Sequence, residues 1–305
     1  MEFKIFVIVV TYNGMHWYDR CFGSLRRSVI PVQTVVVDNA SSDNTVEFIR
    51  QNYPEITLFP SDVNLGFGQG NNKGIRYALE HDADYVFLLN QDAWIEPDTI
   101  GELVRIHKEN PEYGILSPMH LNPEKTAIEK SLLHRIANYQ ITSSQLVNDM
   151  FFSSLKDVYN TKYVNAAAWL LPVNTLNNVG GFDPVFFHYG EDDNYLSRVL
   201  YHGMKIGICP RFIVSHDAER KLPESYSLQH NGHKLLLHEI TDVNTNVSVN
   251  KLLIFHFRRM ILSGMTLNKR KLIYNFQRYL FIVKKRKAAL MSRKQNKTTG
   301  RNWLK

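Results

Sequence analysis

Short runs of β-branched residues alternate with helical stretches through the first 120 residues, and this alternation restricts the fold more than any other feature. It predicts strands and helices in turn at residues 3–11, 16–27, 32–37, 42–52, 56–59, 68–80, 85–89 and 97–108. Such alternation implies a parallel sheet with helices on both faces. Ligands of open sheets bind beyond the carboxyl ends of the strands, so the polar residues that follow these strands are the first functional candidates.

The rest of the chain is less regular. Residues 122–160 are polar and without clear periodicity, which predicts an irregular insertion or lid. Further on, the pattern predicts a strand at 163–171, a helix at 191–201, and short strands at 205–209 and 212–215. Beyond about residue 222 the pattern is helical. We therefore expect an α/β domain over residues 1–220 and a helical extension over residues 221–305.

Charge is distributed unevenly along the chain. Residues 251–305 hold 16 of the 36 lysines and arginines and no acidic residue, whereas all 29 acidic residues lie in the first 250. A basic tail on an acidic body is typical of a protein that meets an anionic surface. We expect this tail to lie on an anionic membrane, and its alternative role is to pack on the body. A nucleic-acid partner is not expected, because the acidic body opposes it and no nucleic-acid-binding module is recognisable.

The location of the protein is expected to be cytoplasmic, with peripheral attachment to the inner face of the membrane. Cys21 and Cys209 are far apart and form no CxxC pair, which fits a reducing compartment. The apolar run from Ile5 to Val10 is too short for a secretory signal. No segment approaches the roughly 20 apolar residues of a membrane-spanning helix.

Two polar segments near the N-terminus suggest a nucleotide site. A carboxylate at a strand end, such as Asp38, can accept the N3–H of uracil or thymine, which cytosine lacks. A helix-capping loop is the alternative for this segment. The glycine-rich stretch from Asn64 to Gly74 permits close backbone approach before a helix, or marks a tightly packed helix. The first strand lacks the GxGxxG sequence after it, which argues against a dinucleotide-dependent oxidoreductase.

A hydrophobic strand ends in Asn90-Gln91-Asp92, an oxygen-rich triplet. Residues two apart in an extended segment share one face, so Asn90 and Asp92 can both point at one divalent cation. An Asx turn is the alternative for such a triplet. His216 follows a later strand and becomes a third metal-ligand candidate in combination with the triplet, although a lone histidine there is more often structural.

Three successive carboxylates, Glu191 to Asp193, open the helix predicted at 191–201. Acids are common at this position because the positive end of the helix dipole favours them. These acids follow the aromatic segment from Phe186 to Tyr189, which would form a concave wall. A carboxylate in such a wall can deprotonate an acceptor hydroxyl as a general base.

Together these segments resemble the family 2 glycosyltransferases with the GT-A fold, and within them the rhamnosyltransferase-like group. The resemblance covers about residues 3–220, and its seven motifs occur in the order of the family. The motifs are Val9-Val10-Thr11-Tyr12-Asn13, Val36-Val37-Asp38-Asn39 with the Ser-Asp that follows, Asn64-x-Gly66 with Asn71-x-x-Gly74, Leu88-Leu89-Asn90-Gln91-Asp92, Gly181-Phe182-Asp183, Gly190-Glu191-Asp192, and His216. The implied fold is a Rossmann-like, mostly parallel sheet with helices on both faces.

The resemblance also implies a role for each matching residue. Asp192 is expected to be the catalytic base and Glu191 to position the acceptor. A divalent cation, Mg²⁺ or Mn²⁺, is expected on Asp92, Asn90 and His216. Many relatives have Asp at position 90, so the neutral Asn predicts weaker metal affinity. The expected donor-binding residues are Thr11, Tyr12, Asn13, Asp38, Asn39, Asn64, Gly66, Asn71, Gly74, Asn90 and Gln91, and the expected acceptor-binding residues are Trp169, Asp183 and His188.

The implied activity is metal-dependent sugar transfer with inversion at the anomeric carbon. The expected donor is a UDP- or dTDP-sugar, and the expected acceptor is a hydroxyl group of a glycan, lipid-linked, in cell-surface polysaccharide synthesis. A non-catalytic relative that binds nucleotide-sugar or glycan is the alternative. The presence of Asp92, Glu191 and Asp192 argues against that alternative.

Overall fold

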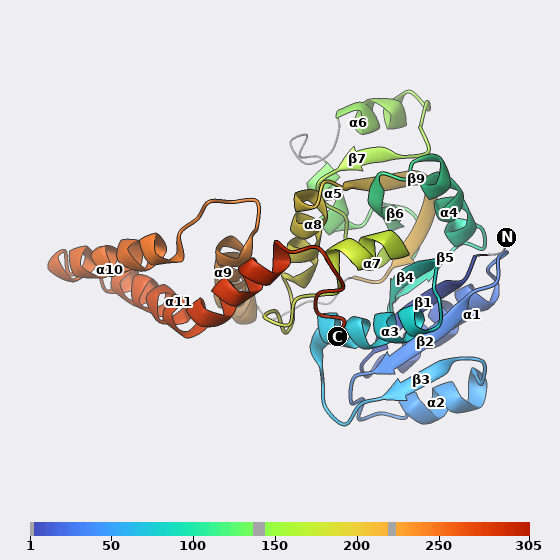
Figure 1. The fold of residues 1–305 in the computed structure, drawn as a ribbon, viewed down its shortest axis with the longest axis horizontal. Coiled ribbons are helices and arrows are strands. Elements are labelled where there is room, and N and C mark those ends of the chain that lie inside the picture. Colours follow the sequence, from blue (N-terminus) through green and yellow to red (C-terminus); the bar gives the residue numbers. More distant parts are fainter. Residues whose placement is uncertain (1–2, 137–143, 219–223) are drawn as a thin grey trace.

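The computed structural model describes residues 3–136, 144–218 and 224–305 (Figure 1). Within these residues one sheet of nine strands has the order β3-β2-β1-β4-β8-β6-β9-β5, and β7 also pairs with β9. The strands are β1 (Ile5–Thr11), β2 (Gln33–Asp38), β3 (Thr57–Pro60), β4 (Tyr85–Asn90), β5 (Ala93–Ile95), β6 (Tyr113–Leu121), β7 (Tyr159–Thr161), β8 (Ala168–Pro172) and β9 (Lys205–His216). The helices are α1 (Met15–Arg26), α2 (Thr45–Asn52), α3 (Gly66–Glu80), α4 (Thr99–Glu109), α5 (Lys130–Ile136), α6 (Ser144–Phe151), α7 (Val173–Val179), α8 (Glu191–Tyr201), α9 (Glu224–Thr241), α10 (Val249–Met265) and α11 (Lys269–Asn296).

The first half of the sheet is parallel, as the strand–helix alternation predicts. Strands β3, β2, β1 and β4 pair in parallel in that order. Successive residues of β1 point to opposite faces of the sheet and join different hydrophobic cores. Val7 belongs to the core that includes α1, α2 and α4, and Ile8 belongs to the core that includes α3, α7 and α8. Both faces of the sheet are therefore covered by helices, and the predicted α/β class is confirmed.

The second half of the sheet is mixed, which periodicity did not indicate. Strand β8 lies antiparallel between β4 and β6, and β5 and β7 are antiparallel to β9. The strand predicted at 163–171 is shorter and later, as β8. The two short strands predicted after residue 204 are one strand, β9, whose pairing with β6 shifts between Pro118 and Met119. Pro210 lies in that irregularity and lacks the N–H of a regular ladder, so the sequence suggested a break.

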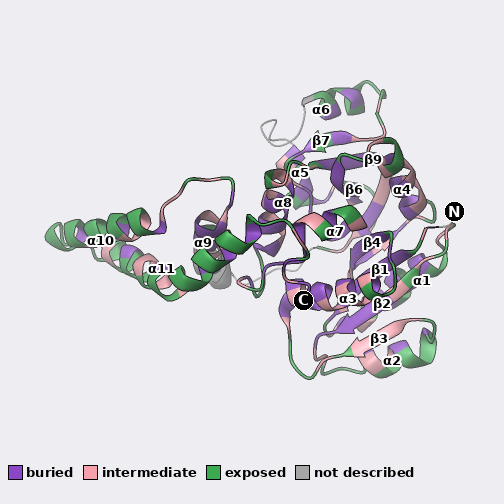
Figure 2. Ribbon diagram, in the orientation of Figure 1, coloured by how far each residue is buried: buried purple, intermediate pink, exposed green. Residues whose placement is uncertain are grey.

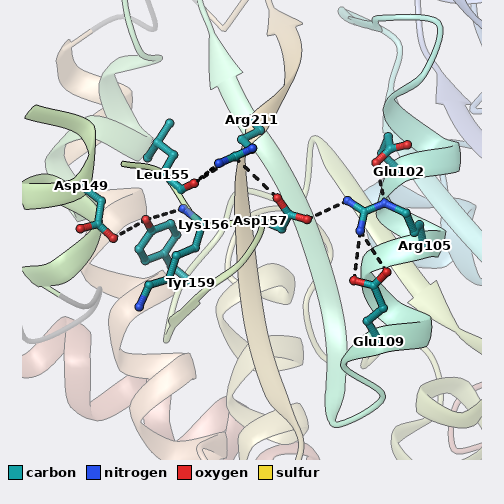
Figure 3. A network of polar contacts seen from close by, with 9 residues as sticks. All are labelled: Glu102, Arg105, Glu109, Asp149, Leu155, Lys156, Asp157, Tyr159 and Arg211. Atoms are coloured by element: carbon teal, nitrogen blue, oxygen red, sulfur yellow. Dashed lines mark hydrogen bonds and ion pairs between the residues drawn. The ribbon is translucent and has the colours of Figure 1, made fainter. Parts of the chain in front are cut away.

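The segment predicted to be irregular, 122–160, contains α5, α6 and β7, so that prediction was wrong for these elements. The short helices form because Leu132, Ile136 and Leu146 bury their side chains in the main core. Residues 137–143 lie outside the described chain. After α6 the segment is held against the body by Asp157, which pairs with Arg105 of α4 at 2.7 Å (Figure 3). This part of the predicted lid is thus anchored.

The C-terminal helices form an extension from the body. The α10–α11 hairpin projects away from the sheet, and its surface is largely exposed (Figures 1 and 2). None of the helices in the described ranges is both long and apolar enough to span a bilayer. The predicted domain boundary at residues 220–221 falls outside the described chain.

The far end of α11 returns to the body and joins its core. Asp183 is 1% exposed, and its Oδ2 accepts hydrogen bonds from Ser292 Oγ and, at 2.7 Å, from Asn296 Nδ2. The buried Arg198 of α8 donates to Val179 O at 3.2 Å and to Asn296 Oδ1 at 3.4 Å. Gly181 N donates to Asn302 O at 2.7 Å. The end of α11 and the residues after it are therefore part of the folded body.

Replacing Asp183 with Ala should lower the free energy of unfolding by about 2–4 kcal/mol, because Asn296 Nδ2 loses a charge-assisted bond in a buried site. Chemical denaturation measures this change. Asp62→Ala, in an exposed loop, is the control and should stay within about 0.5 kcal/mol. Equal stability of the two variants would contradict the docking role of Asp183.

Candidate active site

The carboxyl ends of β1, β2 and β4 bring the first predicted residues together. Thr11 Oγ1 donates to Asp38 Oδ1 at 2.9 Å, which ties β1 to β2. Tyr12 N donates to Gln91 Oε1 at 2.8 Å, and Gln91 Nε2 donates to Tyr12 O at 3.2 Å, which ties β1 to the residue after β4. The adjacent Asn13 accepts from Ser42 N at 2.8 Å. The structure thus places all these residues at one edge of the sheet.

Asp38 is held in place by its neighbours. Its side chain accepts from Thr11 and from Ser41 N and Oγ, and the residue is 2% exposed. The side chain of Tyr12 is more open, and the residue is 44% exposed. The edge thus carries an exposed aromatic residue and a buried, oriented carboxylate.

The loop before α3 is fastened to the same edge. Asn39 Nδ2 donates to Gly66 O at 3.2 Å, its Oδ1 accepts from Leu65 N at 3.0 Å, and Asn64 Oδ1 accepts from Gly66 N at 2.8 Å. Gly66 has a φ of +76°, and a Cβ there would lie 2.0 Å from Phe187 O. Glycine is required at this position because the backbone approaches the segment before α8 closely.

Within α3 the predicted residues have packing roles. A Cβ at Gly74 would lie 2.4 Å from Ile8 Cγ2, so this glycine lets the helix approach β1. Asn71 is 2% exposed and donates to Phe67 O of its own helix. The sequence analysis missed Asn72, which accepts from Phe182 N at 2.7 Å and donates to Phe182 O at 2.8 Å. Both asparagines are buried, and the sequence gave no signal as to which one would bond to Phe182.

Asp92 and His216 meet where β5 pairs with β9, and Asn90 ends the neighbouring strand β4. His216 Nε2 lies 3.4 Å from Asp92 Oδ1, and Asp217 N donates to Asp92 O at 2.9 Å. Asn90 Oδ1 and His216 Nδ1 are buried, and neither has a hydrogen-bond partner in the described chain. The carboxylate of Asp92 and the imidazole of His216, which lie together, are ligand types that a divalent cation accepts.

Two further ligand-type residues adjoin His216 and were not found from the sequence. His120 of β6, Glu129 before α5 and His216 each offer a ligand atom, and these atoms lie within 4.8 Å of one another. Burial, with His216 adding to it, lowers the pKa of His120 to about 3, so this imidazole is neutral. No local motif indicates these residues, because they meet through the pairing of β6 with β9.

The three acids in the first turn of α8 have different surroundings. Asp193 pairs with Lys234 Nζ at 3.4 Å and with Arg135 Nη2 at 3.9 Å. Burial raises the pKa of Glu191 to about 7, and the charge of Asp192 contributes. Burial also raises the pKa of Asp192, with a contribution from Asp193. Glu191 Oε2 and Asp192 Oδ1 are buried without a protein partner among the described residues, so the hydrogen-bonding capacity of both oxygens is unused.

The predicted acceptor-binding residues do not lie together at the surface. Trp169 is fully buried in β8, where it stacks on Phe182 with ring centroids 6.2 Å apart. Asp183 is buried beneath α11. The structure therefore gives these two side chains core positions instead of a surface for acceptor contact. His188 is exposed, and so are its neighbours Phe187 and Tyr189.

Comparison with known proteins identifies sequences that this chain resembles. The family described as "Glycosyl transferase family 2" matches residues 6–165. The low-salt glycan biosynthesis hexosyltransferase Agl10 of Haloferax volcanii is 28% identical over 208 residues, which are 67% of this chain and 64% of that protein. The N-acetylglucosaminyl-diphospho-decaprenol L-rhamnosyltransferase of Mycobacterium tuberculosis is 26% identical over 205 residues, 61% of this chain and 67% of that protein. The match with Agl10 thus spans less than two thirds of its length.

Solved structures share the fold. Staphylococcus aureus TarS 1–349 in complex with UDP superposes with a TM-score of 0.57 at 16% identity, covering 96% of this chain and 89% of that one. GalNAc-T7 with UDP, GalNAc and Mn²⁺ gives a TM-score of 0.55 at 14% identity, covering 77% and 49%. The predicted GT-A fold is confirmed.

The buried carboxyl of Glu191 should cost stability at high pH. Its raised pKa means that the folded state holds the proton up to about pH 7, whereas the unfolded chain loses it near its ordinary value. Stability therefore falls as pH rises through this window. At pH 8, Glu191→Gln removes the free-energy cost of the buried, ionised carboxylate. It should raise the thermal midpoint by about 2–4 °C for each kcal/mol of this cost, and by less at pH 5. Scanning calorimetry measures both, with the exposed Glu80→Gln as control. An equal effect at the two pH values would refute the raised pKa.

Proposed function

Because the chain belongs to glycosyl transferase family 2, we propose that it transfers a sugar from a UDP- or dTDP-sugar to a hydroxyl group of a lipid-linked glycan, with inversion, in cell-surface polysaccharide synthesis. The names of the hexosyltransferase and rhamnosyltransferase relatives support the reaction class. The TarS complexes with UDP and UDP-GlcNAc support a nucleotide-sugar donor.

The observation that carries this proposal is the pair of buried, unpartnered carboxyl oxygens beside the donor loop. Glu191 Oε2 and Asp192 Oδ1 lack a partner in the described residues, at the start of α8. A Cβ at Gly68, in the first turn of α3, would lie 3.7 Å from Glu191 Cβ. The acids therefore adjoin the segment that bears Asn64 and Gly66. In sugar transfer the acceptor hydroxyl attacks the anomeric carbon of the donor, so the base that deprotonates the acceptor is expected to lie beside the nucleotide site.

At the donor end, Thr11, Tyr12, Asn13, Asp38 and Gln91 provide the nucleotide site in this proposal. Asp38 accepts the N3–H of uracil or thymine, and Thr11 orients its carboxylate. A cytosine base offers no such proton. The exposed ring of Tyr12 gives a face against which a base can stack.

Asp92, Asn90 and His216 are the residues that would hold a divalent cation. A cation bound there supplies positive charge to the diphosphate of the departing nucleotide. The unpartnered Asn90 Oδ1 and the position of His216 beside Asp92 support this role. Asp92 contributes the carboxylate charge of this ligand set.

Asp192 acts as the general base. Its carboxylate takes the proton of the acceptor hydroxyl while that oxygen forms a bond to the anomeric carbon and the bond from this carbon to the diphosphate oxygen breaks. Attack from the face opposite the leaving group inverts the anomeric configuration. Glu191 positions the acceptor, and the exposed Phe187, His188 and Tyr189 offer surface for it.

Replacing Asp192 with Asn should reduce kcat by about 10²-fold or more while donor affinity stays within about 2-fold, because the amide cannot accept the proton. In the wild type, kcat/KM should fall as pH drops through the raised pKa of Asp192. Steady-state transfer and donor calorimetry measure these quantities. Asp62→Asn, in an exposed loop, is the control. Normal turnover of Asp192→Asn with loss in Glu191→Gln would move the base to Glu191.

We further propose that the α10–α11 hairpin attaches the protein to the cytoplasmic face of an anionic membrane. Large apolar side chains are exposed along it, and at its tip Met265 is 77% and Leu267 87% exposed. Exposed Lys269, Arg270 and Lys271 follow directly. Each basic residue near an anionic surface contributes about 1 kcal/mol to binding. The absence of acids over 251–305 and the lipid-linked substrate named for the mycobacterial relative support this attachment.

Full-length protein should float with vesicles that contain phosphatidylglycerol at low salt, and much less with neutral vesicles. Changing Lys269, Arg270 and Lys271 to Gln should reduce the bound fraction several-fold, because it removes about 3 kcal/mol of attraction. The control changes Arg27, Arg50 and Lys162, which are exposed on the body. A chain cut at residue 250 is unsuitable, since it also removes Ser292 and Asn296. Unchanged flotation of the hairpin variant would refute the attachment.

A further inference from the structure

His120 has an unused ring nitrogen in the interior of the protein. The residue is fully buried in β6, and its Nε2 lies 3.0 Å from Ser117 Oγ. The Ser117 hydroxyl donates to Pro118 O at 3.2 Å, so Nε2 carries the ring hydrogen and donates to Ser117. Nδ1 therefore keeps its lone pair, and it has no hydrogen-bond partner in the described part of the chain. A buried acceptor without a donor costs free energy, which a bound cation would remove.

Glu129 is oriented beside it by a set of donors. Oε1 accepts from Ser131 N at 3.0 Å, and Oε2 accepts from Ser131 Oγ at 2.8 Å, from Leu132 N at 3.1 Å and from Asn165 Nδ2. The residue is 7% exposed. Hydrogen bonds of this kind fix the position of carboxylates that ligate metals. The bond from His120 Nε2 to Ser117 has the same effect on the imidazole ring.

His216 completes the group from the neighbouring strand. The rings of His120 and His216 are nearly perpendicular, at 89°, with centroids 6.1 Å apart. One ligand atom from each of His120, Glu129 and His216 lies within 4.8 Å of the others. Each histidine has one buried ring nitrogen, Nδ1, without a partner in the described ranges.

We propose that His120, Glu129 and His216 bind a first-row transition-metal ion in the absence of nucleotide. Two imidazoles and one carboxylate favour such an ion over Mg²⁺, which prefers oxygen ligands and retains its water. The inference shares His216 with the cation site of the proposed function and extends it into the interior. The two sites differ in their ligands: the inner group has two imidazoles and one carboxylate, so it needs no diphosphate oxygen of a nucleotide to bind its ion.

Cobalt binding to the full-length, chelator-treated protein tests this site without any donor. Titration with Co²⁺, followed by visible absorption and calorimetry, should show one ion bound at least about 10-fold more tightly than Mg²⁺. His120→Phe, which keeps an aromatic ring of similar size without a ligand atom, should weaken Co²⁺ binding by about 10–100-fold, and Glu129→Gln should weaken it similarly. His107→Phe is the matched control, since His107 is half-buried on α4 and bonds to Tyr85.

Absence of Co²⁺ binding without nucleotide, or equal binding by wild type and His120→Phe, overturns the inference. Circular dichroism and the thermal midpoint establish that each variant is folded, and if His120→Phe fails to fold, Glu129→Gln decides the matter. Sugar transfer is measured separately with UDP- and dTDP-sugars. Transfer without Co²⁺ binding refutes the inner site alone, whereas Co²⁺ binding without transfer from any donor refutes the proposed function alone.

Discussion

The close approach of α3 to β1 positions most of the candidate site. Gly70 and Gly74 lie against Val10 and Ile8, and a Cβ at either glycine would overlap a side chain of the strand. Since the helix can lie this close, Asn72 reaches the backbone of Phe182 with both atoms of its amide. These two hydrogen bonds, together with the contact of Gly66 with Phe187, set the segment before α8 against the donor loop. Larger residues at these glycines would move the acids away from the nucleotide edge.

A second contact joins the acid-bearing segment to the end of the chain. Asp183 accepts from Ser292 and Asn296 of α11, and Phe186 packs with Leu236, Leu237 and Ile240 of α9. The Gly-Phe-Asp motif therefore connects the body with the extension, which explains why Asp183 lies in the core. Asp183 has this structural role although its motif lies close in sequence to the proposed base, Asp192, because it fixes the segment that leads into α8.

How much the sequence could predict depended on whether the signal was local. Strands β1 to β4 and helices α1 to α4 followed from periodicity, whereas β5 and β6 were not predicted. Asp92 and His216, predicted as one cation site, do lie together. Periodicity does not name the neighbours of a strand, so the insertion of β8 between β4 and β6 was not predictable. His120 and Glu129 were missed for the same reason, since they reach His216 through the β6–β9 pairing. The burial of Trp169 follows from the insertion of β8 between β4 and β6, because a tryptophan in a strand can face either core or solvent.

The extension and the acids are also coupled by charge. Lys234 of α9 pairs with Asp193 at 3.4 Å and lowers the pKa that burial raises at Asp192. The turn of α8 can hold three successive acids because Asp193 is neutralised from α9 and from Arg135, and because the helix N-terminus favours negative charge. Asp192 keeps a raised pKa, which suits a base that must take a proton from a hydroxyl group. A residue beyond position 220 thus adjusts the proposed catalytic base. Helix α9, which bears Lys234, packs on both α8 and α11. Attachment of the α10–α11 hairpin to a membrane would therefore be transmitted to α8 through α9.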